Sequence, residues 1–145
     1  MTDFLFQKRP QGASVDSVSF LGWLDALARF VIPGVYTPTL TDVTNLDGST
    51  AYQVPFVRIG DCVVMGLRFD ANPTASAATE LGISLPVPSD FTNADTDAMG
   101  SFSANAIQQG GRVDAGTTNN RLRLRWDASD TANRNFGGFA IYRIK

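Results

Sequence analysis

The sequence contains no histidine, a single cysteine and a single glutamate. Without histidine, neither a Ser-His-Asp nor a Cys-His catalytic arrangement can form, and zinc or iron sites with imidazole ligands are excluded. The lone thiol, Cys62, excludes an internal disulfide and any metal site built from several cysteines. Only carboxylate chemistry or an oxygen-liganded metal remains, and no sequence motif supports either. We therefore expect that the protein is not an enzyme and binds no cofactor and no metal ion.

Lysine is also scarce: only two of the twelve basic residues, Lys8 and Lys145, are lysines, and Glu80 is the single glutamate among fourteen acidic residues. Glu and Lys are good helix formers, whereas Asp, Asn, Gly, Ser and Thr favour turns and caps. The composition therefore favours strands. A net charge of −2 provides no basic footprint for nucleic acid. No run is long and apolar enough to span a bilayer, and the first residues lack the order of a secretory signal. We expect neither a nucleic-acid nor a membrane partner, and folding in a cytosol.

Residues 1–33 predict an N-terminal arm followed by one short amphipathic helix. The arm combines an apolar triplet with two bases and is then broken by Pro10 and Gly12. Apolar residues at helical spacing predict a helix over about 17–31, which Pro33-Gly34 ends. A frayed arm and a helix packed on its own domain are the ordinary interpretation. The alternative is a capsid or oligomer contact, for which the candidate residues are Phe4, Leu5, Phe6, Lys8, Arg9, Phe20, Trp23, Leu24, Leu27 and Phe30.

From Val35 onward the pattern changes to short segments of alternating polarity separated by turn signals, which predicts an all-β domain over 34–145. The clearest features are a hairpin of 51–59 with 62–69 around Gly60-Asp61, and a strand over 121–126 whose Leu122, Leu124 and Trp126 face inward. Further strands are expected over 35–46, 81–85, 99–107 and 136–144, with a turn at Asp47-Gly48. Strands at this spacing favour a sandwich, jelly roll or barrel.

Two charged patterns allow more than one interpretation. Arg121, Arg123 and Arg125 share one face of a predicted strand, either as a solvated ladder with acidic cross-strand partners, as an intersubunit salt bridge or as a polyanion contact. The closely spaced aspartates at 95 and 97 and at 127 and 130 match no EF-hand loop and are typical of turns. Cys62 is typical of a small apolar strand residue.

Several short motifs follow one another in a recognisable order after Gly34. Residues 34–41 are G-V-Y-T-P-T-L-T and residues 57–64 are V-R-I-G-D-C-V-V, followed by N-P-T at 72–74 and L-G-I-S-L-P at 81–86. This order resembles a β-rich domain of structural proteins of tailed phages and prophages, and the resemblance covers residues 34–145. Asn72 and Cys62 depart from the residues usual at these positions in that domain.

The resemblance implies a jelly-roll-like β-sandwich, symmetric assembly into a homo-oligomer with a trimer favoured, and a place in the virion after assembly in the host cytoplasm. We expect a capsid decoration (cement) protein that binds and stabilises the major capsid protein or another virion protein, because the 33 preceding residues are short for a fibre shaft. The alternative is a tail-fibre or receptor-binding tip that contacts host saccharide. A carboxylate-based glycosidase is disfavoured by the single glutamate.

Overall fold

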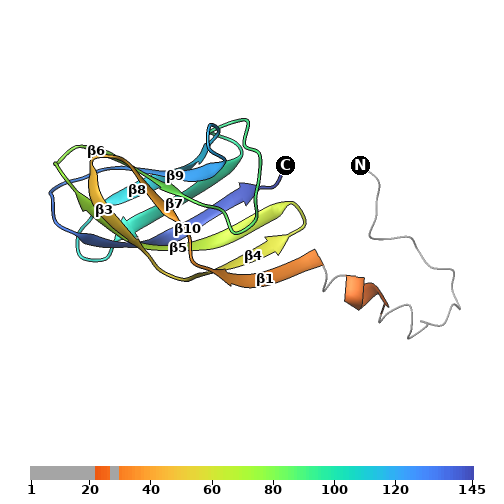
Figure 1. The fold of residues 1–145 in the computed structure, drawn as a ribbon. Coiled ribbons are helices and arrows are strands. Elements are labelled where there is room, and N and C mark those ends of the chain that lie inside the picture. Colours follow the sequence, from red (N-terminus) through yellow and green to blue (C-terminus); the bar gives the residue numbers. More distant parts are fainter. Residues whose placement is uncertain (1–21, 27–29) are drawn as a thin grey trace, which may run out of the picture. The chain divides into compact units, whose positions relative to one another are not determined.

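The computed structural model describes residues 22–26 and 30–145, and the chain divides into two units, 1–30 and 31–145 (Figure 1). In the first unit, residues 22–26 and Phe30 are helical. The predicted helix was extended one residue too far, because Val31 begins the first strand, and Pro33-Gly34, predicted to end the helix, lies inside that strand. Among the described residues, no helix has the length and apolarity needed to cross a membrane.

The second unit is an antiparallel β-structure, which confirms the predicted all-β class. Its strands are β1 (Val31–Tyr36), β2 (Leu40–Thr44), β3 (Leu46–Ala51), β4 (Val54–Ile59), β5 (Cys62–Pro73), β6 (Ala78–Ile83), β7 (Ala98–Ala104), β8 (Gly110–Gly116), β9 (Arg121–Asp127) and β10 (Arg134–Arg143).

The strands form one curled sheet in the order β1-β4-β5-β10-β7-β8-β9-β6-β2, with β3 pairing to β5. The meander β7-β8-β9 has β10 beside its first strand, which is a Greek-key arrangement. Jelly rolls also contain Greek keys, and the specific jelly-roll assignment stays a prediction. Phe69 of β5 packs against Trp126 of β9 across the interior, with ring centroids 6.3 Å apart, so these strands lie on opposite walls of the barrel.

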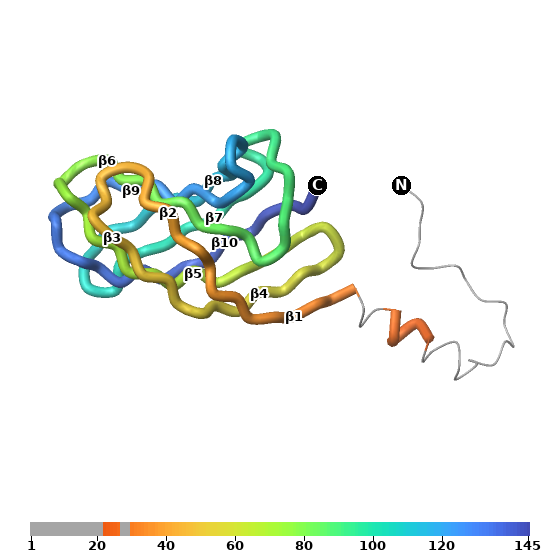
Figure 2. The backbone as a smooth tube through the Cα atoms, in the orientation of Figure 1, coloured from red at the N-terminus to blue at the C-terminus, as the bar shows by residue number. Residues whose placement is uncertain are grey.

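Between β2 and β3 the chain turns a corner and passes from one wall to the other (Figure 2), and Asn45 is the residue between these two strands. It adopts a φ of 57°, a left-handed conformation that asparagine tolerates better than most residues. Its side-chain amide donates to the Ala75 carbonyl at 2.8 Å and to the Thr79 hydroxyl at 2.8 Å, and its carbonyl accepts from the Thr74 hydroxyl. On one side of this corner β2 pairs with β6, and on the other side β3 pairs with β5. The corner therefore closes the barrel.

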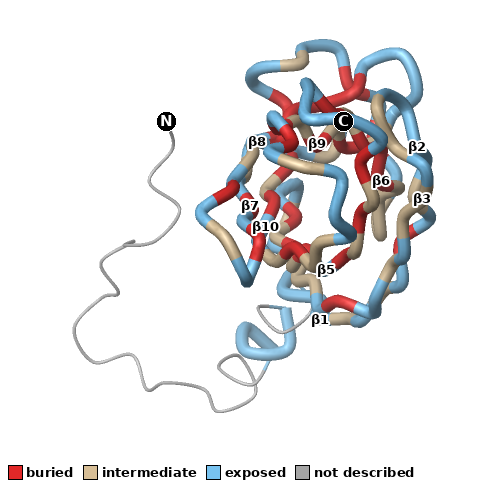
Figure 3. The backbone as a smooth tube through the Cα atoms, turned by 90° about the vertical axis from the view of Figure 1, so that its left-hand side faces the viewer, coloured by how far each residue is buried: buried red, intermediate tan, exposed pale blue. Residues whose placement is uncertain are grey.

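The core is aromatic and lies between the two walls. Phe69, Phe102, Trp126 and Phe136 form a cluster with ring centroids 5.1 to 6.3 Å apart. Such pairs contribute about 0.5–1.5 kcal/mol each beyond burial of their area. In Figure 3 the buried stretches follow the strands around the interior, whereas β2 and β3 are largely exposed or partly buried.

The predicted inward alternation of Leu122, Leu124 and Trp126 is confirmed, because all three are buried. The hairpin of β4 and β5 is also present, with Gly60 at a φ of 59° in its two-residue turn.

Other predicted boundaries were wrong. Segment 35–46 is not one strand: it spans the end of β1, all of β2 and the first residue of β3, with a break around Pro38. Strand β8 was missed. Asp47-Gly48 lies inside β3 and not in a turn, because the chain reverses at Asn45 and a bulge absorbs the extra residue between Leu46 and Gly48.

Candidate functional site

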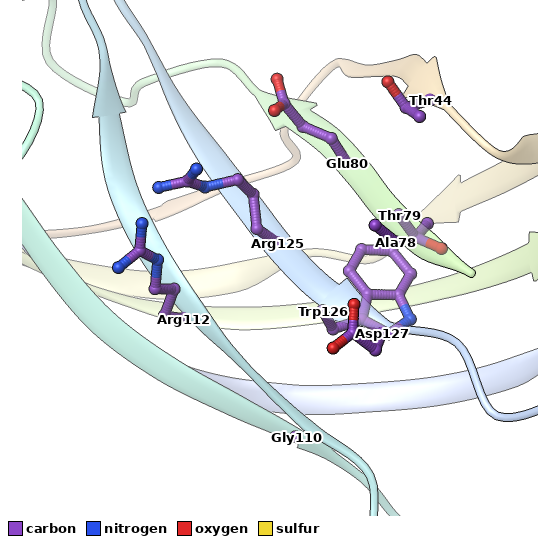
Figure 4. A pocket seen from close by; sticks show the side chains of 9 residues that line it. All are labelled: Thr44, Ala78, Thr79, Glu80, Gly110, Arg112, Arg125, Trp126 and Asp127. Carbon is purple, nitrogen blue, oxygen red and sulfur yellow. The ribbon is translucent and has the colours of Figure 1, made fainter.

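An open groove lies on the outer surface of the wall formed by β8, β9 and β6. Its volume is about 470 Å³, and β2 contributes one further residue to it. Figure 4 shows the Arg112 side chain from β8 and the Arg125 side chain from β9, with Glu80 of β6 beyond them. We call this pocket the arginine groove; its lining residues are Thr44, Ala78, Thr79, Glu80, Gly110, Arg112, Arg125, Trp126 and Asp127.

Strand register explains why the charges gather here. Arg125 pairs with Glu80 on one side and with Arg112 on the other, so the three side chains cross neighbouring strands at one level. Residues 121, 123 and 125 point outward because Leu122 and Leu124 between them fill the core. The sequence pattern on a single strand therefore becomes a basic surface once β8 is added beside it.

Asp114 lies at the centre of this basic surface and is only 6% exposed. The Arg125 guanidinium donates to Asp114 Oδ2 through Nε at 2.7 Å and also through Nη2. Arg112 Nε lies 3.3 Å from the same oxygen, and Arg123 Nη2 lies 3.9 Å from it. One carboxylate thus holds three guanidinium groups together, and a charge buried in this way is strongly favourable only while its partners remain.

The groove presents hydrogen-bonding groups of both positive and negative charge. Arg112 and Arg125 already share Asp114, and Glu80 and Asp127 add two carboxylates to the lining. Because the guanidinium charges are largely balanced, the lining suits a ligand rich in hydroxyl groups more than a polyanion. The Trp126 indole packs in the core beneath the groove, and its buried Nε1 has no hydrogen-bond partner within the described part of the chain. Among the residues 22–26 and 30–145, no group of three or more potential metal ligands is present.

A second charged contact fastens the C-terminal end of the domain. Lys145 Nζ lies 2.8 Å from Asp97 Oδ1, and the Asp97 carboxylate also accepts hydrogen bonds from the backbone N–H groups of Thr92 and Asn93, both at 2.7 Å. The ammonium of Lys145 and these donors hold the pKa of Asp97 well below its usual range. Burial raises the pKa of Tyr142 to about 12, and its hydroxyl donates to the Val87 carbonyl. Both contacts secure the long β6–β7 loop, away from the groove.

The opposite wall carries a very different surface, which we call the apolar face. Its residues alternate with the core residues of β4, β5, β10 and β7 and continue onto β1, and cross-strand pairing arranges them in three rows. The central row consists of Pro33, Val57, Val64, Ile141 and Met99. One flanking row consists of Val35, Pro55, Gly66 and Phe139 and ends on β7 with Ser101. The other consists of Val31, Ile59 and Cys62 and ends on β10 with Arg143.

Several large side chains on the apolar face are well exposed. Val35 is 65% exposed, Met99 58% and Phe139 49%. Around Phe139 the face is hollowed into a shallow apolar pocket of about 260 Å³, lined also by Pro55, Val57 and Val64. A contiguous apolar patch of this kind on a soluble protein often marks an interaction site.

The predicted contact residues fall mainly outside the described part of the chain. Phe4, Leu5, Phe6, Lys8, Arg9, Phe20 and Leu27 lie outside the described residues. Trp23, Leu24 and Phe30 are described and are exposed. Their role as a capsid or oligomer contact stays a prediction.

Sequence reasoning missed the two surfaces themselves. Asp114 lies in β8, which was not predicted, and Arg112 shares that strand. The apolar face was missed because Val31 and Pro33 were assigned to the helix and its end. One signal was present in the sequence, namely that Val63 and Val64 are both apolar, so that β5 has apolar residues on both of its faces.

Comparison with protein-family models and with curated proteins gives no match. Among solved structures, the chain is similar to the attachment protein sigma1 of a reovirus, whose crystal structure was determined in complex with α-2,3-sialyllactose. The TM-score is 0.50 and the sequence identity 14%, and the match covers 79% of this chain and 67% of that chain. At this identity the similarity shows a shared fold: the β-domain is built like that of a viral β-rich protein.

Proposed function

We propose that this chain is a structural protein of a virus particle that acts by binding other molecules and not by catalysis. The observation that carries the proposal is the division of the barrel surface into an apolar face on one wall and the arginine groove on the other. A module held on a particle needs one surface for the particle and leaves another for different contacts, and apolar and polar patches serve such roles. The fold shared with sigma1, a viral attachment protein, supports this proposal.

Within this proposal, the role favoured by the sequence is capsid decoration. The chain would bind the major capsid protein or another virion protein through residues 1–33, with the β-domain outward, and would associate with copies of itself, a trimer being favoured. Trp23, Leu24 and Phe30 are exposed apolar residues in that segment and suit burial against a partner.

The test is the location of the protein in purified particles. Gold-labelled antibody against the β-domain should decorate the capsid shell in electron micrographs, and the chain should co-purify with particles through a density gradient. Label confined to the tail tip would indicate a tail-fibre role and exclude capsid decoration. Absence of the chain from purified infectious particles would refute the virion proposal altogether, and hydrolysis of host glycan by the purified protein would refute the non-catalytic part.

The arginine groove favours a second candidate, a receptor-binding tip that contacts host saccharide. Guanidinium, carboxylate and threonine groups surround it, and these hydrogen-bond sugar hydroxyls well. The sigma1 protein was crystallised in complex with sialyllactose, which supports a saccharide as a ligand class to test.

A glycan array should then show binding by the wild-type chain. That binding should be lost in Glu80→Gln, which removes a groove carboxylate, and kept in Asp61→Asn, whose carboxylate lies in the β4–β5 turn. Equal binding by Glu80→Gln and wild type would exclude the groove.

A further inference from the structure

We propose that the apolar face is the surface through which copies of this chain associate, with each copy covering the face of another. The inference rests on the homo-oligomer in the proposed function and names its interface. Across the face, side chains from five strands meet with no charge in the central row, where Pro33, Val57, Val64, Ile141 and Met99 lie side by side. Arg143, beside Cys62, lies at the margin of the face. Two copies that meet at the central row and leave Arg143 at the rim would bury no unpaired charge, so the desolvation cost that limits polar contacts is small.

The size of the face fits a subunit contact. Strands about 4.8 Å apart and residues about 3.3 Å apart give five strands by five residues a projected area of roughly 400 Å². This lies within the range of the largest, often functional, patches on monomers, but it is about half of what one partner buries in a standard stable interface. Phe30 directly precedes β1 in the sequence, Trp23 and Leu24 lie a few residues earlier, and all three are exposed, so every copy carries them as well as the face. A second copy therefore offers the missing apolar area.

Edge pairing is a weaker route to association. Among the described strands β1 is an edge strand, paired only to β4, and Pro33 at its centre has no N–H to donate to an added strand. The outer side chains of β1 remain available, however, because Gly34 packs inward against the Phe56 ring while Val35 points outward. Association is therefore expected face to face. Homo-oligomers close by symmetry, and three copies with this face turned to a common axis would cover it completely.

The single cysteine provides a direct probe. Cys62 is exposed in the described chain and lies on the apolar face, paired with Ile59 and Arg143. Its thiol should react slowly with a maleimide reagent when the full chain is assembled and faster as the protein is diluted. No other thiol in the chain contributes to this signal.

The experiment combines sedimentation velocity with maleimide labelling of the full-length chain and its variants. Wild type should sediment as a multiple of 15.6 kDa with Cys62 protected. Ile59→Lys and Phe139→Lys should sediment as single chains with the thiol labelled at the rate of dilute protein. Val43→Lys is the matched control, because Val43 is 43% exposed, as Ile59 is, but lies on β2 outside the face. It should assemble like wild type.

Each outcome decides the proposal. If Ile59→Lys and Phe139→Lys remain assembled with Cys62 protected as in wild type, association runs through another surface and the inference is wrong, while the oligomer itself stands. If wild type is monomeric at every concentration, the proposed homo-oligomer fails as well. Circular dichroism verifies that each variant is folded. If a lysine variant does not fold, Phe139→Ser is the milder replacement. A folded Phe139→Ser protein that assembles with Cys62 protected would equally refute the inference.

Discussion

Replacing Asp114 with asparagine removes the charge that holds three arginines on the outer wall of the barrel while keeping the shape of the side chain. Removing one member of a buried ion pair costs about 3–5 kcal/mol. Here the Arg112 side chain is 63% exposed and can turn to solvent, whereas the Arg125 and Arg123 side chains are only 34% and 30% exposed. We therefore expect a smaller loss, about 2 kcal/mol, and for a chain of this length a fall in melting temperature of roughly 4–8 °C.

Thermal unfolding followed by circular dichroism measures this loss. Asp127→Asn is the control, since Asp127 is exposed at the end of the same strand as Arg125, and it should change stability by less than about 0.5 kcal/mol. Added salt should restore part of the stability of Asp114→Asn, because it screens the repulsion among the uncompensated arginines. If Asp114→Asn melted at the temperature of Asp127→Asn, with no response to salt, the carboxylate would not organise the cluster.

Three further predictions concern the framework that positions both surfaces. Asn45→Ala should destabilise the domain by about 1–3 kcal/mol in chemical denaturation, because the amide hydrogen bonds are lost and alanine disfavours the φ of 57°. Asn45→Gly should cost less, because it loses the same hydrogen bonds but glycine tolerates this φ. Equal losses in the two variants would assign the whole effect to the hydrogen bonds. Gly138→Ala should unfold or severely destabilise the protein, because an added Cβ would collide with the Ser101 carbonyl oxygen. Gly48→Ala, which has open space at the position of its Cβ, should be tolerated. A native melting curve for Gly138→Ala would contradict the packing of β10 on β7. Asp97 has a folded pKa below its unfolded value of about 3.9, so the stability that it contributes is present above the unfolded pKa and is lost as the pH falls through the folded pKa. Asp97→Asn should therefore be less stable than wild type at neutral pH and should lose less stability on acidification. Parallel pH profiles of the two proteins would contradict this.

Local patterns in the sequence were sufficient for the elements that depend on neighbours along the chain. The alternation of Leu122, Leu124 and Trp126 with arginines predicted both the strand and its inward face, because side chains of a strand alternate with a period of two. The β4–β5 hairpin was predictable for the same reason, since its turn needs a residue such as Gly60 at positive φ.

Elements whose conformation depends on distant partners were not predictable in this way. Val31 and Pro33 continue an apolar run that is compatible with a helix, and only pairing with Ile59 and Val57 makes them a strand. Asp47-Gly48 is a common turn sequence, but the turn lies at Asn45, whose side chain bonds to residues about 30 positions away. Long-range pairing overrides local propensity at these places.

The two candidate surfaces likewise depend partly on local sequence patterns and partly on long-range strand pairing. The sequence by itself determined an all-β domain without histidine chemistry, a basic face on β9 and an apolar core, because composition and period-two alternation act within single strands. Only the tertiary structure decided that Asp114 of β8 would sit among those arginines and that the outer residues of five strands would join into one apolar face. The physical reason is that strand order and register bring together side chains that are remote in the sequence, and neither is encoded in the alternation of any one strand.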